Sequence, residues 1–145
     1  MRVVVPKEIK DGEKRVALVP DVINKLTRLG FDVVIESGAG SHSQAVDAEY
    51  KAAGAMISDG EVLSTADAVL SVQPLTPAQM SKLKKGAITI SFLSPVTAVD
   101  SIDAAASAGV TAFSLELVPR ISRAQSMDAL TSQALCAGYR AVLVG

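Results

Sequence analysis

Cysteine, histidine and tryptophan are almost missing from this chain of 145 residues, which contains one Cys, one His and no Trp. A disulfide framework is excluded, because it needs paired cysteines. One Cys and one His are too few to supply the usual ligands of a zinc site. Cys136 and His42 are also the only two residues from which a Cys–His nucleophilic pair could be built. Most familiar hydrolytic mechanisms therefore lack their residues, and no metal site is predicted.

The chain also lacks an excess charge of either sign, since 14 Lys and Arg against 15 Asp and Glu give a formal net charge of −1. Nucleic acids and anionic membranes bind dense basic patches, so neither is expected as a partner. No apolar run approaches the ~18 residues of a membrane span. Charge follows the first Met too closely for a signal peptide, so the expected location is the cytoplasm.

Apolar side chains make up 49% of the residues, and they occur in short runs separated by segments with helical spacing. Runs rich in Val, Ile and Phe predict strands at 2–5, 31–35, 68–72, 87–92 and 110–114. Apolar spacing with Pro, Gly and capping signals predicts helices at 20–29, 47–53, 76–85, 99–108 and from about 124 onward. The alternation predicts one α/β domain with a doubly wound, mostly parallel sheet of flavodoxin or Rossmann type.

Ligands of such sheets bind outside the carboxyl ends of the strands, where the strand order reverses. Gly38-Ala39-Gly40 follows the second predicted strand and resembles the start of the dinucleotide-binding pattern G-x-G-x-x-G. Ser43 replaces the third glycine, and the pattern belongs to the first strand of its unit. We therefore interpret the glycines as a tight turn and the fold as lacking a true fingerprint. His42 is interpreted as a solvated loop side chain, and Cys136 as a small core residue of the last helix.

A loop from Lys7 to Leu18 follows the first predicted strand and carries charges of both signs. Arg15 lies just before an apolar stretch of this loop. Two interpretations stay open for it: a clamp for a ligand carboxylate or phosphate, or a solvated surface residue. The other charges of the loop are interpreted as solvated surface.

The most informative segment, 118–133, lies beyond the last predicted strand. It gathers two Arg, two Gln, an Asp and several hydroxyls. Gln125, Asp128 and Ser132 are spaced i, i+3 and i+7, which predicts that they share one helical face, with Thr131 at its edge. Arg120 precedes that face. The segment is therefore the main candidate for a binding site.

Helix capping is the competing interpretation of this polarity. Ser122 and Gln125 have the spacing of a capping box, and Asp128 would complement the helix dipole. Capping does not explain Arg120 and Arg123, because two cations at a helix N-terminus oppose the dipole. They indicate an anionic or amide-bearing ligand, or a partner carboxylate, at this place.

Several segments also carry a resemblance to a known family. The chain reads Pro-Arg-Ile-Ser-Arg-Ala-Gln-Ser-Met-Asp at 119–128, Val-Pro-Lys-Glu at 5–8, Arg-Val-Ala at 15–17, Glu-Ser-Gly-Ala-Gly at 36–40 and Ala-Gly-Tyr-Arg-Ala at 137–141. Over essentially the whole chain, these segments resemble the alanine dehydrogenase/transhydrogenase family. Within that family they resemble the amino-terminal domain of the alpha subunit of proton-translocating NAD(P) transhydrogenases.

Departures from the family pattern favour one branch of it. Alanine dehydrogenases place a Lys after the third strand and a His after the fourth, to bind and activate the amino acid. Gln73 and Ser94 stand at the aligned positions here, and they supply neither a cation nor a general base at neutral pH. Arg15 remains from that constellation as the candidate substrate-binding residue. An alanine-dehydrogenase-like amino acid oxidoreductase and a non-catalytic interaction module of the same fold are the alternatives to a transhydrogenase.

The resemblance implies NAD(H) as cofactor and direct hydride transfer from NADH to NADP⁺, coupled to proton translocation and without proton abstraction. It implies that Arg120, Gln125 and Asp128 are catalytic. Arg120 and Gln125 would hold the nicotinamide carboxamide and its ribose. Asp128, with Thr131, would complete the polar network that positions them. The same three residues, with Thr131 and Ser132, would form the cofactor-binding set.

The resemblance further implies that residues 1–145 form the first subdomain of the NAD(H)-binding component. The family's NAD-binding Rossmann domain follows a helix like 124–144 and is absent from this sequence. We therefore expect the isolated chain to be inactive and to bind NAD(H) weakly. The implied partners are that second domain, the NADP-binding and membrane components, and a second copy in a homodimer. The implied location is cytoplasmic, peripheral to the inner membrane through the partner subunits.

Overall fold

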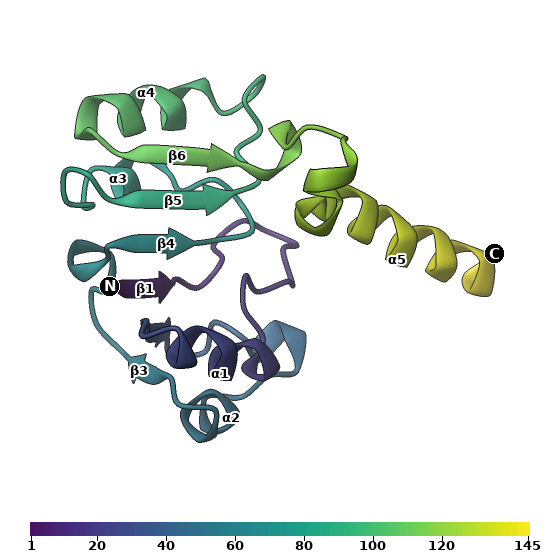
Figure 1. The fold of residues 1–145 in the computed structure, drawn as a ribbon, viewed down its shortest axis with the longest axis horizontal. Coiled ribbons are helices and arrows are strands. Elements are labelled where there is room, and N and C mark those ends of the chain that lie inside the picture. Colours follow the sequence, from purple (N-terminus) through teal and green to yellow (C-terminus); the bar gives the residue numbers. More distant parts are fainter.

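Six parallel strands form a sheet at the centre of the structure, a computed structural model that describes residues 1–145 (Figure 1). The strands are β1 (Arg2–Val5), β2 (Asp32–Glu36), β3 (Met56–Ser58), β4 (Ala68–Leu70), β5 (Ile88–Ser91) and β6 (Thr111–Ser114). Their order is β3-β2-β1-β4-β5-β6, and every neighbouring pair is parallel. This order is that of Rossmann folds, so the predicted doubly wound α/β class is confirmed.

The strand at the edge, β3, is not among the predicted strands. It contains only the three residues Met-Ile-Ser and pairs with β2 alone. Such a short segment carries neither a β-branched run nor an alternation long enough to recognise. The other five strands lie close to the predicted ranges. The sheet buries most residues of β1, β2 and β4, whereas the edge strand β6 has no buried residue and leaves Phe113 exposed.

Helices connect the strands and cover both faces of the sheet. They are α1 (Pro20–Arg28), α2 (Asp47–Ala52), α3 (Pro77–Met80), α4 (Val99–Ala108) and α5 (Ala129–Val144), with 3-10 turns η1 (Ser41–Ser43), η2 (Leu63–Thr65), η3 (Leu115–Leu117) and η4 (Ser122–Met127). The predicted capping box starts α3, where the Thr76 hydroxyl accepts a hydrogen bond from the amide of Gln79 at 3.2 Å. After Met80 the chain continues in turns that close over three residues, so α3 ends earlier than predicted.

Two buried clusters lie on opposite faces of the sheet, because successive side chains of a strand point to opposite sides. On β1, Val4 packs with Met80 of α3 and Ala105 of α4, whereas Val5 packs with Ile23 of α1 and Tyr50 of α2. The larger cluster has 11 buried residues and the smaller one has 8. The sheet is therefore a rigid platform whose carboxyl edge holds the connecting loops.

The glycine turn after β2 is a packing device, as the sequence interpretation holds. A Cβ atom at Gly40 would lie 2.6 Å from the carbonyl oxygen of Ala45 and 2.7 Å from the ring of Tyr50. The Tyr50 hydroxyl donates to the carbonyl of Leu18 at 2.7 Å and so fixes the loop after β1. His42 lies exposed beside this turn.

The last helix, α5, projects away from the sheet (Figure 1). None of its 16 residues is buried, although Leu135, Tyr139, Val142 and Leu143 are large apolar side chains. The prediction that Cys136 is a core residue is therefore wrong, since its side chain is exposed on this helix. None of the helices, α5 included, has both the length and the apolar character that crossing a membrane requires.

Candidate functional site

The candidate site lies at the carboxyl edge of the sheet, where the strand order reverses between β1 and β4. The loops that follow β1, β4, β5 and β6 meet there, and the start of α5 closes one side. Polar side chains from these loops form a connected network, and two pockets open beside it.

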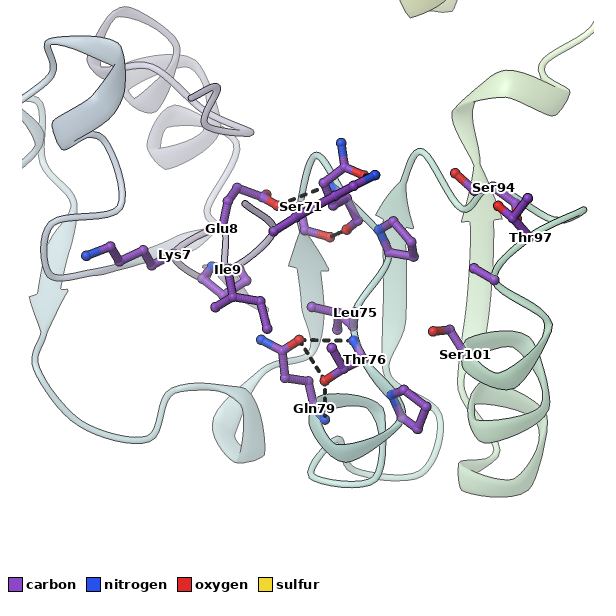
Figure 2. A pocket seen from close by; sticks show the side chains of 16 residues that line it. Lys7, Glu8, Ile9, Ser71, Leu75, Thr76, Gln79, Ser94, Thr97 and Ser101 are labelled. Atoms are coloured by element: carbon purple, nitrogen blue, oxygen red, sulfur yellow. Dashed lines mark hydrogen bonds between the residues drawn. The ribbon is translucent and has the colours of Figure 1, made fainter. Parts of the chain in front are cut away.

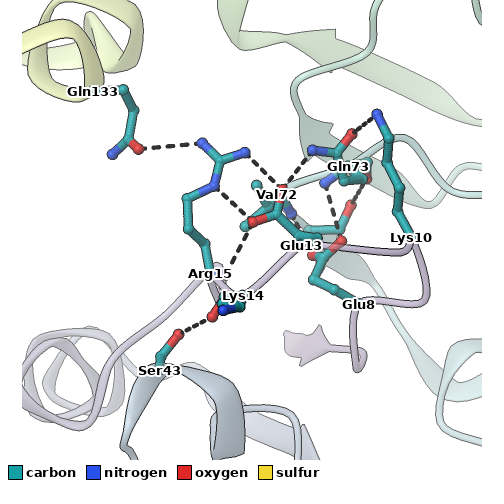
Figure 3. A network of polar contacts seen from close by, with 10 residues as sticks. Glu8, Lys10, Glu13, Lys14, Arg15, Ser43, Val72, Gln73 and Gln133 are labelled. Atoms are coloured by element: carbon teal, nitrogen blue, oxygen red, sulfur yellow. Dashed lines mark hydrogen bonds and ion pairs between the residues drawn. The ribbon is translucent and has the colours of Figure 1, made fainter. Parts of the chain in front are cut away.

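Arg15 is the centre of the network, which Figure 3 shows. Its Nε and Nη2 atoms donate to the two carboxylate oxygens of Glu13 at 2.8 and 2.7 Å. Its Nη1 atom donates to the side-chain oxygen of Gln133 on α5 at 3.2 Å. The guanidinium also lies 5.7 Å from the centre of the Phe92 ring. Arg15 therefore links the loop after β1 to the last helix and is held as a planar group at a fixed place.

Gln73, at the end of β4, extends the network across the reversal point. Its side-chain nitrogen donates to Glu13 at 2.6 Å, and its side-chain oxygen accepts from the ammonium of Lys10 at 3.1 Å. The carboxylate of Glu8 accepts from the backbone amides of Val72 at 2.6 Å and Gln73 at 3.2 Å. The loop after β1 is thus tied to the end of β4 by two carboxylates.

The two carboxylates differ in their electrostatics. The hydrogen bond from Arg15 lowers the pKa of Glu13 from 4.5 to about 2, so this carboxylate is ionised throughout the neutral range. Burial raises the pKa of Glu8, and the amides of Val72 and Gln73 oppose that shift. Glu13 is consequently the charged partner that occupies two donor atoms of Arg15.

A pocket of about 420 Å³ lies between the loops after β1 and β4 and the start of α4 (Figure 2). Ser94, Thr97 and Ser101 line one side, facing Thr76 and Gln79 on the other. Gln73 and Ser94, the positions that the sequence analysis aligns with a Lys and a His of alanine dehydrogenases, line the same pocket. The structure thus brings these two positions together, and neither residue is a general base.

A second pocket, of about 500 Å³, lies on the other side of the network. Nine of its 14 lining residues are hydrophobic, among them Val72, Phe92 and Leu115. Arg15, Gln133 and Ser132 supply its polar wall. An apolar cavity with a few convergent polar groups is the usual form of a small-molecule binding site.

The segment between β6 and α5 carries the predicted catalytic residues. Glu116 in η3 ties it to the preceding loop, since its carboxylate accepts hydrogen bonds from the amides of Leu93 and Ser94 and from the Ser114 hydroxyl. Arg120 and Gln125 follow with exposed side chains, whereas Ala124 between them is 4% exposed and packs inward. The polar side chains therefore face outward from an anchored segment.

Asp128, Thr131 and Ser132 come together at the start of α5. The carboxylate of Asp128 accepts from the Thr131 amide at 3.0 Å and from the Thr131 hydroxyl at 2.5 Å. The Ser132 hydroxyl donates to the carbonyl of Asp128 at 3.0 Å. Chiefly the bonds from Thr131, and also the charge of Arg120, lower the pKa of Asp128.

Two local expectations for this segment are wrong. Helix α5 begins at Ala129, not near Ala124, because Asp128 is its N-cap and residues 122–127 form the separate turn η4. Ser122 makes no capping bond. Gln125 therefore does not share a helical face with Asp128 and Ser132. The side-chain capping bond that forms is the one from the Thr131 amide to Asp128, and the helix accordingly starts at the next residue.

Glu8, Glu13, Glu116 and Gln133 are site residues that the sequence interpretation missed. The sequence analysis interprets the charges of the loop after β1 as solvated. For Glu13 this is wrong, because its side chain is only 7% exposed. One signal was available for Glu8 and Glu116: they lie within three residues of the ends of β1 and β6, where the amides of neighbouring loops come close. Gln133 carries no comparable signal, since its partner Arg15 is 118 residues away in the chain.

Comparison with known proteins agrees with this geometry. A family model described as "Alanine dehydrogenase/PNT, N-terminal domain" matches residues 4–137. An NAD(P) transhydrogenase alpha-subunit protein of Rhodospirillum rubrum is 43% identical over 152 residues, which cover 100% of this chain and 40% of that protein. Alanine dehydrogenase of Mycobacterium tuberculosis is 36% identical over 147 residues, covering 100% of this chain and 39% of that protein.

Solved structures give the same picture. A transhydrogenase from Sinorhizobium meliloti superposes with a TM-score of 0.94 at 44% identity, covering 99% of this chain and 43% of that one. An L-alanine dehydrogenase superposes with a TM-score of 0.75 at 30% identity, covering 81% of this chain and 33% of that one. The chain thus spans less than half the length of these relatives.

Proposed function

This chain belongs to the family of alanine dehydrogenase and transhydrogenase N-terminal domains, and we propose that it works as the NAD(H)-side component of an NAD(P) transhydrogenase. In this proposal it helps to position NADH for direct hydride transfer to NADP⁺, and the complete protein couples that transfer to proton translocation. The activity belongs to the complete protein, of which this chain corresponds to the first subdomain.

The observation that carries the proposal is the exposed polar segment that begins at Arg120 and ends at the capped start of α5. A guanidinium and a carboxamide, Arg120 and Gln125, stand free on an anchored segment at the carboxyl edge of the sheet. Both groups can hydrogen-bond the amide and the ribose hydroxyls of a nicotinamide nucleoside. The mostly apolar pocket beside Ser132 fits a flat ring. The residues present therefore fit NAD(H).

NADH supplies the hydride when it is bound, and the protein supplies orientation and electrostatics. Arg120 and Gln125 would hold the carboxamide of the ring so that one face stays open toward the second nicotinamide. Asp128 fixes Thr131 and Ser132 through the bonds described above, and so keeps the start of α5 in one geometry. No side chain of the site needs to accept a proton, which suits direct hydride transfer.

Amino acid oxidation is the alternative, and the network at Arg15 argues against it. A substrate carboxylate would need the charge and the donors of Arg15, but three of the five guanidinium N–H groups already donate to Glu13 and Gln133, and Glu13 pairs with its charge. Gln73 donates to the same Glu13. Formation of NADH from NAD⁺ and alanine by the complete protein would favour the alternative.

Helix α5 supports the view that further protein covers this chain. A helix that is apolar on all sides is normally buried, yet every residue of α5 is at least partly exposed. We propose that an NAD-binding Rossmann domain packs against it and closes the NAD(H) cleft. The NADP-binding and membrane components, a second copy in a homodimer and a peripheral position at the inner membrane belong to the same proposal.

Replacing Arg120 by Ala in the complete protein tests the proposal. We expect the rate of hydride transfer to fall about 10- to 100-fold, because a misplaced ring costs rate out of proportion to binding. The dissociation constant of NADH should change much less. Arg28→Ala, on the exposed end of α1, is the matched control. Unchanged turnover in Arg120→Ala would refute the proposed role of this segment.

A further inference from the structure

We propose that Glu116 is a positioning residue, which holds the segment 118–127 in place by binding the loop after β5. Its effect on the reaction rests on the proposed function, because Arg120 and Gln125 lie in that segment. Its effect on the position of the segment does not depend on that function and can be measured separately.

Three donors converge on the Glu116 carboxylate. Its Oε2 atom accepts from the amide of Leu93 at 2.9 Å and from the Ser114 hydroxyl at 2.5 Å, and its Oε1 atom accepts from the amide of Ser94 at 2.5 Å. Two successive backbone amides that point at one anion form a strong and geometrically specific contact. Glu116 therefore joins the ends of β5 and β6 across 22 and 23 residues of chain.

Ser94 makes this contact unusual. Its backbone has a φ of +50°, in the left-handed region that residues other than glycine rarely adopt. In this conformation the Ser94 amide points at Glu116 alongside that of Leu93. The same residue starts a turn, since its carbonyl accepts from the amides of Thr97 and Ala98, both at 2.9 Å. The carboxylate thus stabilises a loop conformation that the backbone alone disfavours.

The segment after Glu116 has no other hydrogen-bonded tie to the sheet. Its backbone bonds outside the 3-10 turns come from Val118, Ile121, Ala124 and Asp128, and each goes to a carbonyl no more than three residues away. No side chain between Leu117 and Met127 forms a hydrogen bond within the protein; the nearest side-chain bonds on either side are those of Glu116 and Asp128. Glu116 is therefore the hydrogen-bonded anchor at the amino-terminal end of this segment, whereas beyond its carboxyl end helix α5 is tied to Arg15 through Gln133.

Charge is part of the anchor. Burial raises the pKa of Glu116, but the Ser114 hydroxyl and the backbone amides of Glu116, Leu93 and Ser94 lower it by more. Glu116→Gln keeps the size of the side chain and removes the charge. It also turns an NH₂ group toward donors, so at least one of the three bonds is lost.

The first test follows backbone amide signals of the 145-residue chain by NMR. In Glu116→Gln we expect at least one of the Leu93 and Ser94 amides to lose its hydrogen-bonded shift, and the signals of 120–127 to move or broaden. Ser114→Ala keeps the carboxylate and should produce a smaller change of the same kind. Glu61→Gln is the control, because Glu61 also accepts a backbone amide, that of Leu63, in a different loop. Unmoved signals for 120–127 in a folded Glu116→Gln variant would overturn the proposal.

The second test measures steady-state hydride transfer by the complete protein. Glu116→Gln should lower kcat about 10-fold or more while the KM for NADH changes less, since misplacement acts mainly on the reacting geometry. Glu116→Asp keeps the charge and should recover part of the rate. If Arg120→Ala is impaired but Glu116→Gln has a normal kcat, the proposed effect of Glu116 on the reaction is refuted. A normal kcat in Arg120→Ala would instead count against the proposed function.

Discussion

The ion pair between Glu13 and Arg15 gives a prediction about pH and stability. Glu13 has a folded-state pKa of about 2, against an ordinary value of 4.5. A pKa that folding lowers contributes stability above the unfolded value, and that contribution is lost as the pH falls through the folded value. Stability from this pair is therefore fully present at neutral pH and decreases from about pH 4.5 toward pH 2.

The size of the effect follows from the exposure of the two partners. The full shift would correspond to about 3 kcal/mol at 1.36 kcal/mol for each pKa unit. The Arg15 side chain is 43% exposed, so water screens the pair although Glu13 is nearly buried. A contribution of about 1–2 kcal/mol remains after that discount. For a domain of this size, it corresponds to a fall in Tm of about 3–6 °C.

The assay is urea unfolding of the wild-type chain and of Glu13→Gln between pH 7 and pH 3. We expect the variant to be less stable at pH 7 and the gap between the two free energies of unfolding to narrow below pH 4.5. Glu61→Gln, which breaks the exposed pair with Lys82, should cost less than about 1 kcal/mol. If wild type and Glu13→Gln differ in free energy of unfolding by the same amount at pH 7 and pH 3, the charge of Glu13 does not stabilise the fold through Arg15.

Two further predictions concern the fold and the cleft. Gly40→Ala should destabilise the chain by about 1–3 kcal/mol in thermal unfolding, because the new Cβ meets the Ala45 carbonyl and the Tyr50 ring. Gly60→Ala is the control: its Cβ has open space around it, so its stability should stay within about 0.5 kcal/mol of the wild type. Equal Tm values for the two variants would contradict the packing argument. Calorimetric titration of NADH into the isolated chain should show no binding at micromolar affinity, because under the proposed function the chain supplies only one wall of the cleft; a micromolar Kd would contradict that proposal.

The sheet could be predicted from the sequence because its signals are local. Runs of β-branched residues mark buried parallel strands, and Pro and Gly mark the helix boundaries. The start of α5 could not be placed in the same way, because Ser122 with Gln125, and Asp128 with Thr131, both fit a cap within one short stretch. Spacing alone cannot say which side chain reaches an amide, and the structure assigns the cap to Asp128.

The polar network could not be predicted because its contacts are long-range. Glu13 meets Gln73 across 60 residues, and Glu116 meets Ser94 across 22. A charged residue in a loop has the same sequence signature whether it is solvated or bonded to a distant amide. The exposure of Cys136 was also hidden, because α5 has the apolar pattern of a buried helix, yet residues 131–144 are all exposed.

Direct hydride transfer by the complete protein is tested most directly by an isotope experiment. The complete protein, with its NADP-binding component, is given NADH that carries deuterium at the transferred position, together with NADP⁺ in ordinary water. The account predicts NADPH that retains the deuterium, because the hydride passes between the two rings without exchange. Unlabelled NADPH would contradict direct hydride transfer. So would a complete protein that makes no NADPH but forms NADH from NAD⁺ and alanine.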